Sequence, residues 1–253
     1  MRKVFGIVRY TFIEIFRNKV YDVLLLFAGV LMMSTLLLGA LGGEQKNRMI
    51  MDLGLVGIET FSLVIAVFAA VTLVLEEMES RTLYLILTRP VGRYQFIVGR
   101  FLGLLAIISL AFALMAGAHL LLLGIVRIPV DAHYALNLYY SWEKIMVITA
   151  VALVFSLFST SALSAVTFTF FFWVMGHFSQ EIRFLARKAS QPLLTFACSA
   201  FYYIAPNFQI MNIRDFTPRL AGTGWLWPAA GYGFSYTLVC LALSVLLFRK
   251  KEF

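Results

Sequence analysis

Apolar residues along this chain are collected into long runs that are separated by short polar stretches. A run of about 20 residues crosses the roughly 30 Å of a bilayer's hydrocarbon as an α-helix, whereas a membrane β-barrel shows short alternating segments. The pattern therefore predicts an all-α integral membrane protein. The apolar runs predict six transmembrane helices, at residues 20–41, 53–75, 93–126, 141–158, 162–178 and 225–248.

Residues 1–19 show a different pattern, in which apolar positions recur at helical spacing among basic ones. This arrangement is typical of an amphipathic helix that lies along a membrane surface. We therefore expect an N-terminal interfacial helix over residues 1–19. Its expected apolar face consists of Val4, Phe5, Val8, Phe12, Ile15 and Phe16.

The segment 179–224, between the last two predicted spans, is not uniformly polar. It contains an apolar run at residues 193–205, which is followed by Pro206 and Asn207. This run is too short to cross a bilayer, so it predicts a re-entrant or interfacial helix within an outer loop.

The distribution of lysine and arginine predicts the orientation of the chain. These residues concentrate in the N-terminal segment, in the central loop 76–100 and at the C-terminus, whereas the two short loops on the opposite side carry few. By the positive-inside rule, both termini and the central loop are expected in the cytoplasm. No internal repeat divides the chain, so we expect a single transmembrane domain over residues 1–253 in a cell membrane, most simply a bacterial inner membrane.

Composition supports the membrane assignment. The 253 residues are 61% hydrophobic and 13% charged, and the mean hydropathy is +0.88, which excludes a soluble globular domain. The net charge of +8 indicates that the chain is attracted to anionic membrane lipids. We therefore expect membrane lipids, and no nucleic acid, among the partners.

The central loop 76–100 is the candidate functional segment, because it places charged residues and a short apolar face between two spans. Leu83 and Leu87 would stack on one face of a short helix. Pro90 and Gly92 then predict a tight turn before the next helix. A polar loop with its own apolar face is suited to docking against a partner outside the membrane.

In this layout the chain resembles the permease subunits of ATP-binding cassette (ABC) exporters of the type-2 class. The first cytoplasmic loop of that family has an acidic stretch, a Thr-Leu motif, a Pro-x-x-Arg motif and a Gly-Lys pair at the start of the third span. Arg81 stands where many members have glycine, and Arg100 replaces the usual lysine. The corresponding residues here are Glu77-Met78-Glu79, Thr82-Leu83-Tyr84-Leu85-Ile86-Leu87, Pro90-Val91-Gly92-Arg93 and Gly99-Arg100.

The resemblance implies that the loop docks onto a separate ATPase, and that the permease works as a dimer, with a second copy or a homologous permease, bound to two ATPase copies. The chain has no G-x-x-x-x-G-K-[ST] phosphate-binding loop, so we expect no enzyme activity and no cofactor of its own, with ATP and Mg²⁺ on the partner. The implied coupling residues are Glu77, Glu79, Arg81, Thr82, Leu83, Leu87, Pro90 and Arg93.

Two other functional classes are less consistent with the sequence. Residues 76–81 match the E-E-x-x-x-R string of an intramembrane endopeptidase family, but the Phe-x-x-x-His motif which that family also needs is absent. An ion-coupled secondary carrier should show inverted repeats and several buried charges, and no repeat is found. The three histidines are scattered, so no metal site is predicted.

Glu59 and His119 are the ionisable residues that we expect inside the spans. At 1.5 Å per residue they lie about 9 Å and about 10 Å from the outer ends of their helices. Their similar depths predict a hydrogen-bonded pair lining the outer exit of a transport pathway, because pairing lowers the cost of burial. The alternatives are that each reaches the headgroups separately, or that His119 bonds to a neighbouring helix.

Overall fold

The computed structural model of the chain describes residues 2–16, 20–41, 43–79, 92–159, 161–189, 191–213, 224 and 226–250. Helices, joined by short turns, account for this part of the chain, so the predicted all-helical fold is confirmed. The α-helices are α1 (Arg2–Phe16), α2 (Val20–Leu41), α3 (Lys46–Glu79), α5 (Arg93–Val126), α6 (Ala132–Phe158), α7 (Ala162–His177), α8 (Ser179–Lys188), α9 (Pro192–Ile204) and α10 (Leu226–Lys250), with 3₁₀ turns η1 (Gly43–Gln45) and η2 (Phe208–Met211).

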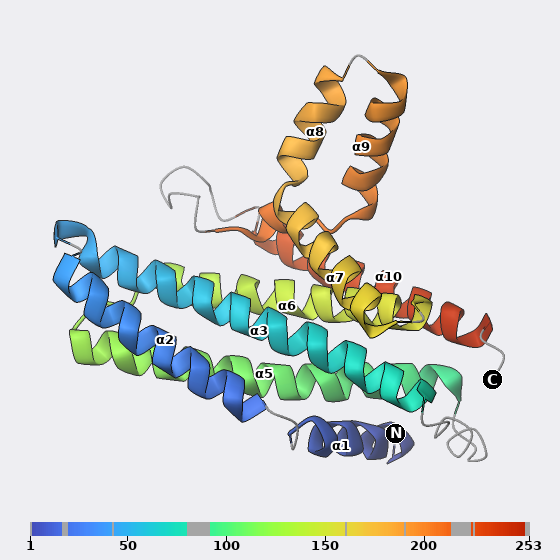
Figure 1. Cartoon of the computed structure of the whole chain (residues 1–253), viewed down its shortest axis with the longest axis horizontal. Coiled ribbons are helices and arrows are strands. Elements are labelled where there is room, and N and C mark those ends of the chain that lie inside the picture. Colours follow the sequence, from blue (N-terminus) through green and yellow to red (C-terminus); the bar gives the residue numbers. More distant parts are fainter. Residues whose placement is uncertain are drawn as a thin grey trace.

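The helices α2, α3, α5 and α6 lie side by side and form the main bundle (Figure 1). The helices α7 and α10 both pack against α6. Apolar side chains that are fully buried fill the space between them, among them Ile58 of α3, Leu104 of α5 and Ile148 of α6. Helices of this kind can cross a membrane because each satisfies its backbone hydrogen bonds internally.

Fewer helices meet the criteria for a membrane span than the sequence predicted. Within the described residues, α3, α5, α6 and α10 are long and apolar enough to cross, and α7 and α8 would add a fifth span if the two helices, bent by 74°, count as one. The helix α2 qualifies only as a shorter apolar helix. The structure therefore supports four or five of the six predicted spans by length and composition.

Two helices begin earlier than predicted. The helix α3 starts at Lys46 rather than at residue 53. In its first turns, Arg48 Nε lies 3.7 Å from Asp52 Oδ2, one helical turn away. The helix α6 starts at Ala132 rather than at residue 141, because Asp131 caps it by accepting a hydrogen bond from the Tyr134 backbone N–H. Polar residues that were predicted as loops are thus the first turns of long helices.

The helix α5 has the bounds that the sequence predicted, residues 93–126. Its N-terminal end follows Gly92, whose N–H donates to the Gln95 side chain at 3.3 Å. Its C-terminal end is set by Arg127, which adopts a left-handed conformation with φ of 61°. On the other side of the central loop, α3 continues as far as Glu79.

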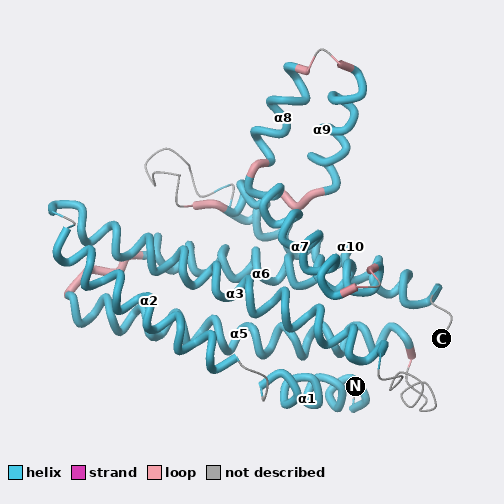
Figure 2. The backbone as a smooth tube through the Cα atoms, viewed as in Figure 1, coloured by secondary structure: helices cyan, strands magenta, loops and turns pink. Residues whose placement is uncertain are grey.

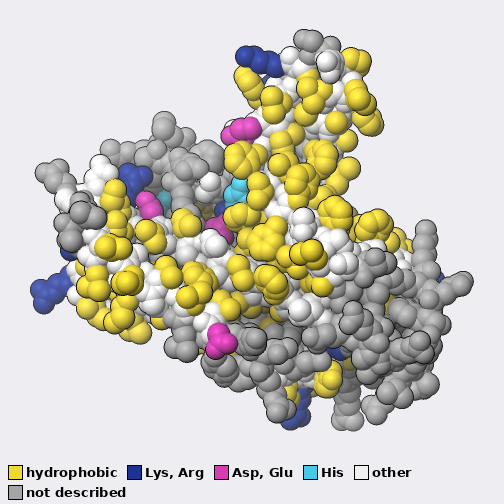
Figure 3. Space-filling view, viewed as in Figure 1, with side chains coloured by type: hydrophobic (Ala, Val, Ile, Leu, Met, Phe, Trp, Pro, Cys, Tyr) yellow, Lys and Arg dark blue, Asp and Glu magenta, His cyan; other side chains and the backbone are white. Residues whose placement is uncertain are grey.

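The predicted outer loop 179–224 contains a helical hairpin made of α8 and α9. The bend between α7 and α8 turns the hairpin away from the bundle (Figure 2). The helix α9 matches the apolar run predicted at residues 193–205, and none of its residues is buried. Apolar side chains cover much of the hairpin surface visible in Figure 3. Its placement as a re-entrant or interfacial element stays a prediction.

The helix α1 covers residues 2–16 of the predicted segment 1–19 and packs along α5, while its placement on a membrane surface stays a prediction. Its inner face consists of residues such as Ile7 and Thr11, which lie over Gly99 and Gly103 of α5. Phe5 of the predicted apolar face is 71% exposed, and the contact of this face with lipid stays a prediction. Because these glycines have no side chain, the α1 face that carries Ile7 and Thr11 can pack closely against α5. The apolar periodicity of α1 alone does not identify this face.

The start of α1, the start of α5 and the C-terminal end of α10 lie at the same end of the bundle (Figure 1). If the helices cross a membrane, this arrangement places both termini and the start of α5 on the same side of it. That this side is the cytoplasmic one stays a prediction.

Candidate functional site

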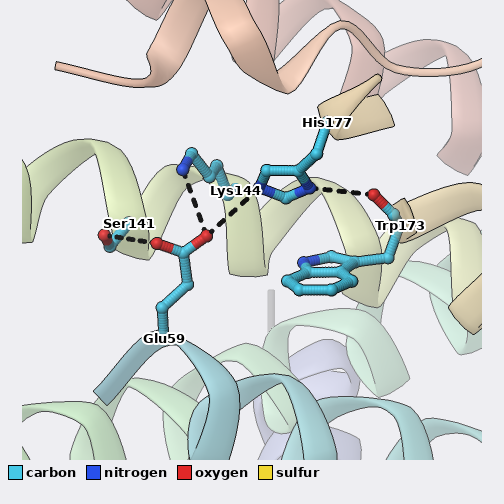
Figure 4. A network of polar contacts seen from close by, with 5 residues as sticks. All are labelled: Glu59, Ser141, Lys144, Trp173 and His177. Carbon is cyan, nitrogen blue, oxygen red and sulfur yellow. Dashed lines mark hydrogen bonds and ion pairs between the residues drawn. The ribbon is translucent and has the colours of Figure 1, made fainter. Parts of the chain in front are cut away.

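A carboxylate on α3, Glu59, is the centre of a polar cluster inside the bundle (Figure 4). The Ser141 hydroxyl donates to Glu59 Oε2 at 3.0 Å, and the Lys144 ammonium donates to Glu59 Oε1 at 3.1 Å. The side chains of Glu59 and Lys144 are only 7% and 4% exposed. The two charges therefore form a buried ion pair between α3 and α6.

The helix α7 contributes His177 to the same cluster. Its Nε2 lies 3.5 Å from Glu59 Oε1, and its Nδ1 lies 2.9 Å from the carbonyl oxygen of Trp173. A carbonyl oxygen only accepts hydrogen bonds, so Nδ1 carries a proton. The imidazole ring also contacts the Trp173 and Phe208 rings, with centroid distances of 4.5 Å and 5.2 Å.

Helical spacing explains how these side chains converge. Ser141 and Lys144 are three residues apart on α6, and Trp173 and His177 are four residues apart on α7, so each pair shares one helical face. The helix α6 thus presents a polar face to α3 inside an otherwise apolar interior. A charge pair in this environment is stable only while both partners are present.

Glu143 lies beside Lys144 on α6 but faces α10. Its carboxyl group lies against Gly233. A Cβ atom added to Gly233 would collide with Oε1 of Glu143 and with Cε of Met211. Glu143 is fully buried, and neither of its oxygens has a hydrogen-bond partner among the described residues. Gly233 therefore provides the room that this carboxyl group occupies.

The segment around η2 covers the cluster. Phe208 is buried against His177 and Gly176, and Met211 is buried against Gly233. Hydrogen bonds connect this segment to α8 and α10: Ser179 Oγ to Asn207 Oδ1 at 2.6 Å, the Asn207 N–H to Tyr232 Oη at 2.8 Å, and Gln209 Nε2 to Glu181 Oε2 at 3.1 Å.

His119 does not join this cluster. Its Nδ1 lies 2.9 Å from the Tyr134 hydroxyl, and its ring packs directly on Gly54. The predicted hydrogen bond between His119 and Glu59 is therefore wrong. The alternative that His119 bonds to a neighbouring helix is confirmed, because Tyr134 belongs to α6.

The reason for this error is rotation about the helix axis. Gly54, which contacts His119, and Glu59 are five residues apart on α3. At 100° per residue they point in directions that differ by about 140°, so a similar depth does not bring His119 and Glu59 together.

The structure locates the two ends of the predicted coupling segment. Glu77 and Glu79 belong to the last turn of α3, and Arg93 is the first residue of α5. The other predicted coupling residues lie outside the described residues, and these are Arg81, Thr82, Leu83, Leu87 and Pro90.

Four residues of the cluster were missed by sequence reasoning: Ser141, Glu143, Lys144 and His177. The adjacent charges of Glu143 and Lys144 fall inside the predicted span 141–158. Charged residues within a span could have indicated a buried polar site there. An ionisable residue within a membrane span is by default a candidate functional residue, and so is the residue that pairs with it. No group of three or more metal-ligating side chains occurs in the part of the chain that the structure describes.

Comparison with known proteins supports a role in transport. The sequence profile of the family described as ABC-2 family transporter protein matches residues 11–253. No curated protein matches the chain. The profile match includes the bundle, the polar cluster, the helical hairpin and both ends of the central loop. The chain is thus a multi-pass membrane permease, and it belongs to the ABC-2 family of transporter proteins.

Proposed function

We propose that this chain is the transmembrane subunit of an ATP-driven exporter. Two permease subunits, either two copies or one copy with a homologous permease, form the translocation pathway and bind two copies of a separate ATPase. The family match supports membrane transport by this chain with an ATPase partner. The coupling to ATP hydrolysis, the pairing, the export direction and the cytoplasmic position of the termini are the proposed parts.

The observation that carries the proposal is the length of the two helices on either side of the central loop. Both α3 and α5 contain 34 residues, so each extends about 51 Å at 1.5 Å per residue. This length exceeds the roughly 30 Å of hydrocarbon in a bilayer. A force on the loop would therefore act on two continuous helices, one of which, α3, carries Glu59 of the polar cluster.

The packing of α1 supports the same route. The Arg100 Nη1 donates to Thr11 Oγ1 at 2.9 Å, and the Arg100 guanidinium lies 5.4 Å from the Tyr10 ring centroid and 5.5 Å from that of Phe96. These contacts join α1 to the first turns of α5, directly after the loop. We infer that α1 and the start of α5 move as one unit when an ATPase docks.

Leu83 and Leu87 are proposed as the apolar contact with the ATPase. Changing Leu87 to Asp would place an unpaired charge in an apolar groove, which costs several kcal/mol of docking free energy. A matched control is Leu85→Asp, because residue 85 lies on the opposite face of the predicted helix.

The experiment is affinity purification of each tagged variant from native membranes, with quantification of the co-purified ATPase. We expect Leu87→Asp to lose at least 90% of the bound ATPase and Leu85→Asp to retain most of it, at equal amounts of inserted permease. Wild-type recovery of the ATPase with Leu87→Asp would refute this contact.

A further inference from the structure

Glu143 is a buried carboxyl group for which the proposed coupling mechanism has no use. Its side chain is fully inaccessible, and neither oxygen has a hydrogen-bond partner among the described residues. Gly233 of α10 and Met211 of η2 lie beside it, and neither offers a side-chain donor. An ionised carboxylate in such surroundings is strongly disfavoured.

The cations of the polar cluster are directed at another carboxylate. Lys144 donates to Glu59 at 3.1 Å, and His177 approaches the same Glu59 oxygen at 3.5 Å. Ser141 donates to the second Glu59 oxygen. Both oxygens of Glu59 therefore have donors in the cluster, and none of these donors bonds to Glu143.

Most titratable groups on the elements around Glu143 have partners of their own, and none of them bonds to Glu143. On α10, the Tyr232 hydroxyl accepts from the Asn207 N–H and the Tyr236 hydroxyl donates to the Ile204 carbonyl. On α5, His119 contacts Tyr134, and on α6 the Tyr140 hydroxyl donates to the Leu226 carbonyl. Of the remaining groups, neither Tyr139 on α6 nor Cys240 on α10 bonds to Glu143, and η2 contains no titratable residue.

We propose that Glu143 is a proton-binding site. In the packed arrangement described here the carboxyl group is the neutral acid. When α10 and Met211 move away and water reaches the group, its O–H bond breaks, the proton passes to water, and the electron pair stays on the carboxylate. A proton is the ligand that fits, because both oxygens are inaccessible to solvent and Gly233 and Met211 occupy the space beside Oε1.

This site links protonation to the packing of α6 against α10. The neutral acid can lie against the Gly233 backbone and the Met211 side chain, whereas the ionised form requires water or a donor. Protonation therefore favours the closed arrangement, and ionisation favours separation of the two helices. This inference goes beyond the proposed export function and does not depend on it.

Infrared difference spectroscopy on the full chain in lipid nanodiscs tests the proposal directly. The wild type should show, at neutral pH, the C=O stretching band of a protonated carboxyl group. Glu143→Gln should lack this band, and Glu59→Gln should retain it. Glu143→Met, which is uncharged and of similar length, provides a second variant if Glu143→Gln does not fold. An unchanged band in both Glu143 variants, or no such band in the wild type, would overturn the assignment.

The pH dependence of unfolding gives a second readout. A solvent-exposed glutamate is ionised at neutral pH, so unfolding of the wild type releases the proton that the folded chain holds. Raising the pH then favours unfolding, because stability falls with pH wherever the folded state binds more protons. We expect the unfolding temperature of the wild type to fall more steeply with rising pH than that of Glu143→Gln. Parallel pH profiles would contradict the proposal.

Discussion

Lys144 determines whether the interior of the bundle can hold the charge of Glu59. In Lys144→Met the Glu59 carboxylate keeps Ser141 and the neighbouring His177 but loses its ammonium partner at 3.1 Å. Breaking a buried pair in this way destabilises by about 3–5 kcal/mol, whereas replacing both members by uncharged groups costs much less. We therefore expect the double variant Lys144→Met with Glu59→Gln to be more stable than Lys144→Met alone. Thermal unfolding in detergent measures this, and additive effects of the two changes would contradict the pairing.

Gly54 makes room for the His119 ring, and this contact gives a second prediction for a single residue. A Cβ atom at residue 54 would collide with the imidazole, whereas one at Gly117 on α5 would meet nothing within 4 Å. Gly54→Ala should destabilise the chain by about 1–3 kcal/mol through overpacking. Gly117→Ala should be neutral or slightly stabilising, because it reduces the entropy of the unfolded chain. Equal unfolding temperatures for the two variants would contradict the packing of His119 on Gly54.

At the scale of helices, the contact between α1 and α5 depends on Gly103. A Cβ atom there would lie 2.6 Å from Thr11 Cβ and 3.1 Å from the Val8 carbonyl oxygen, so α1 would have to shift. Gly6 on α1 is the control, since a Cβ atom there meets nothing within 4 Å. Hydrogen exchange of residues 2–16 should be at least several-fold faster in Gly103→Ala and unchanged in Gly6→Ala. Equal protection in both variants would show that α1 does not depend on this contact.

Helix bounds could be predicted where the sequence carries a strong local signal. The bounds of α5 follow from Gly92 before the helix and from the end of the apolar run at Val126. The starts of α3 and α6 were missed because hydropathy marks where a bilayer begins, while capping by Asp131 and helical spacing of polar residues determine where a helix begins.

The polar cluster was harder to predict than the fold. Sequence reasoning identified Glu59 as a buried charge, and the structure confirms its burial. Its partners could not be derived, because the rotation of each helix about its own axis is set by packing between helices. His177 enters the cluster through the packing of α7 against α3 and α6, and the periodicity of α7 alone does not encode that contact.

At the scale of the whole molecule, large apolar side chains remain on the outside of the chain. Trp227 and Leu238 of α10 are 84% and 66% exposed, and Leu193 and Tyr203 of α9 are 79% and 82% exposed. In a membrane protein such surfaces face lipid or a second transmembrane subunit. Both surfaces are therefore available for the proposed pairing of permease subunits.

The central claim is that this permease uses a separate ATPase. Native mass spectrometry of the tagged chain, isolated from native membranes with its bound partners, tests that claim most directly when ATP hydrolysis is measured on the same sample. The account predicts a complex of two permease subunits and two ATPase copies, with hydrolysis lost when the ATPase is removed. ATP hydrolysis by the purified chain alone, with no second polypeptide in the spectrum, would contradict it.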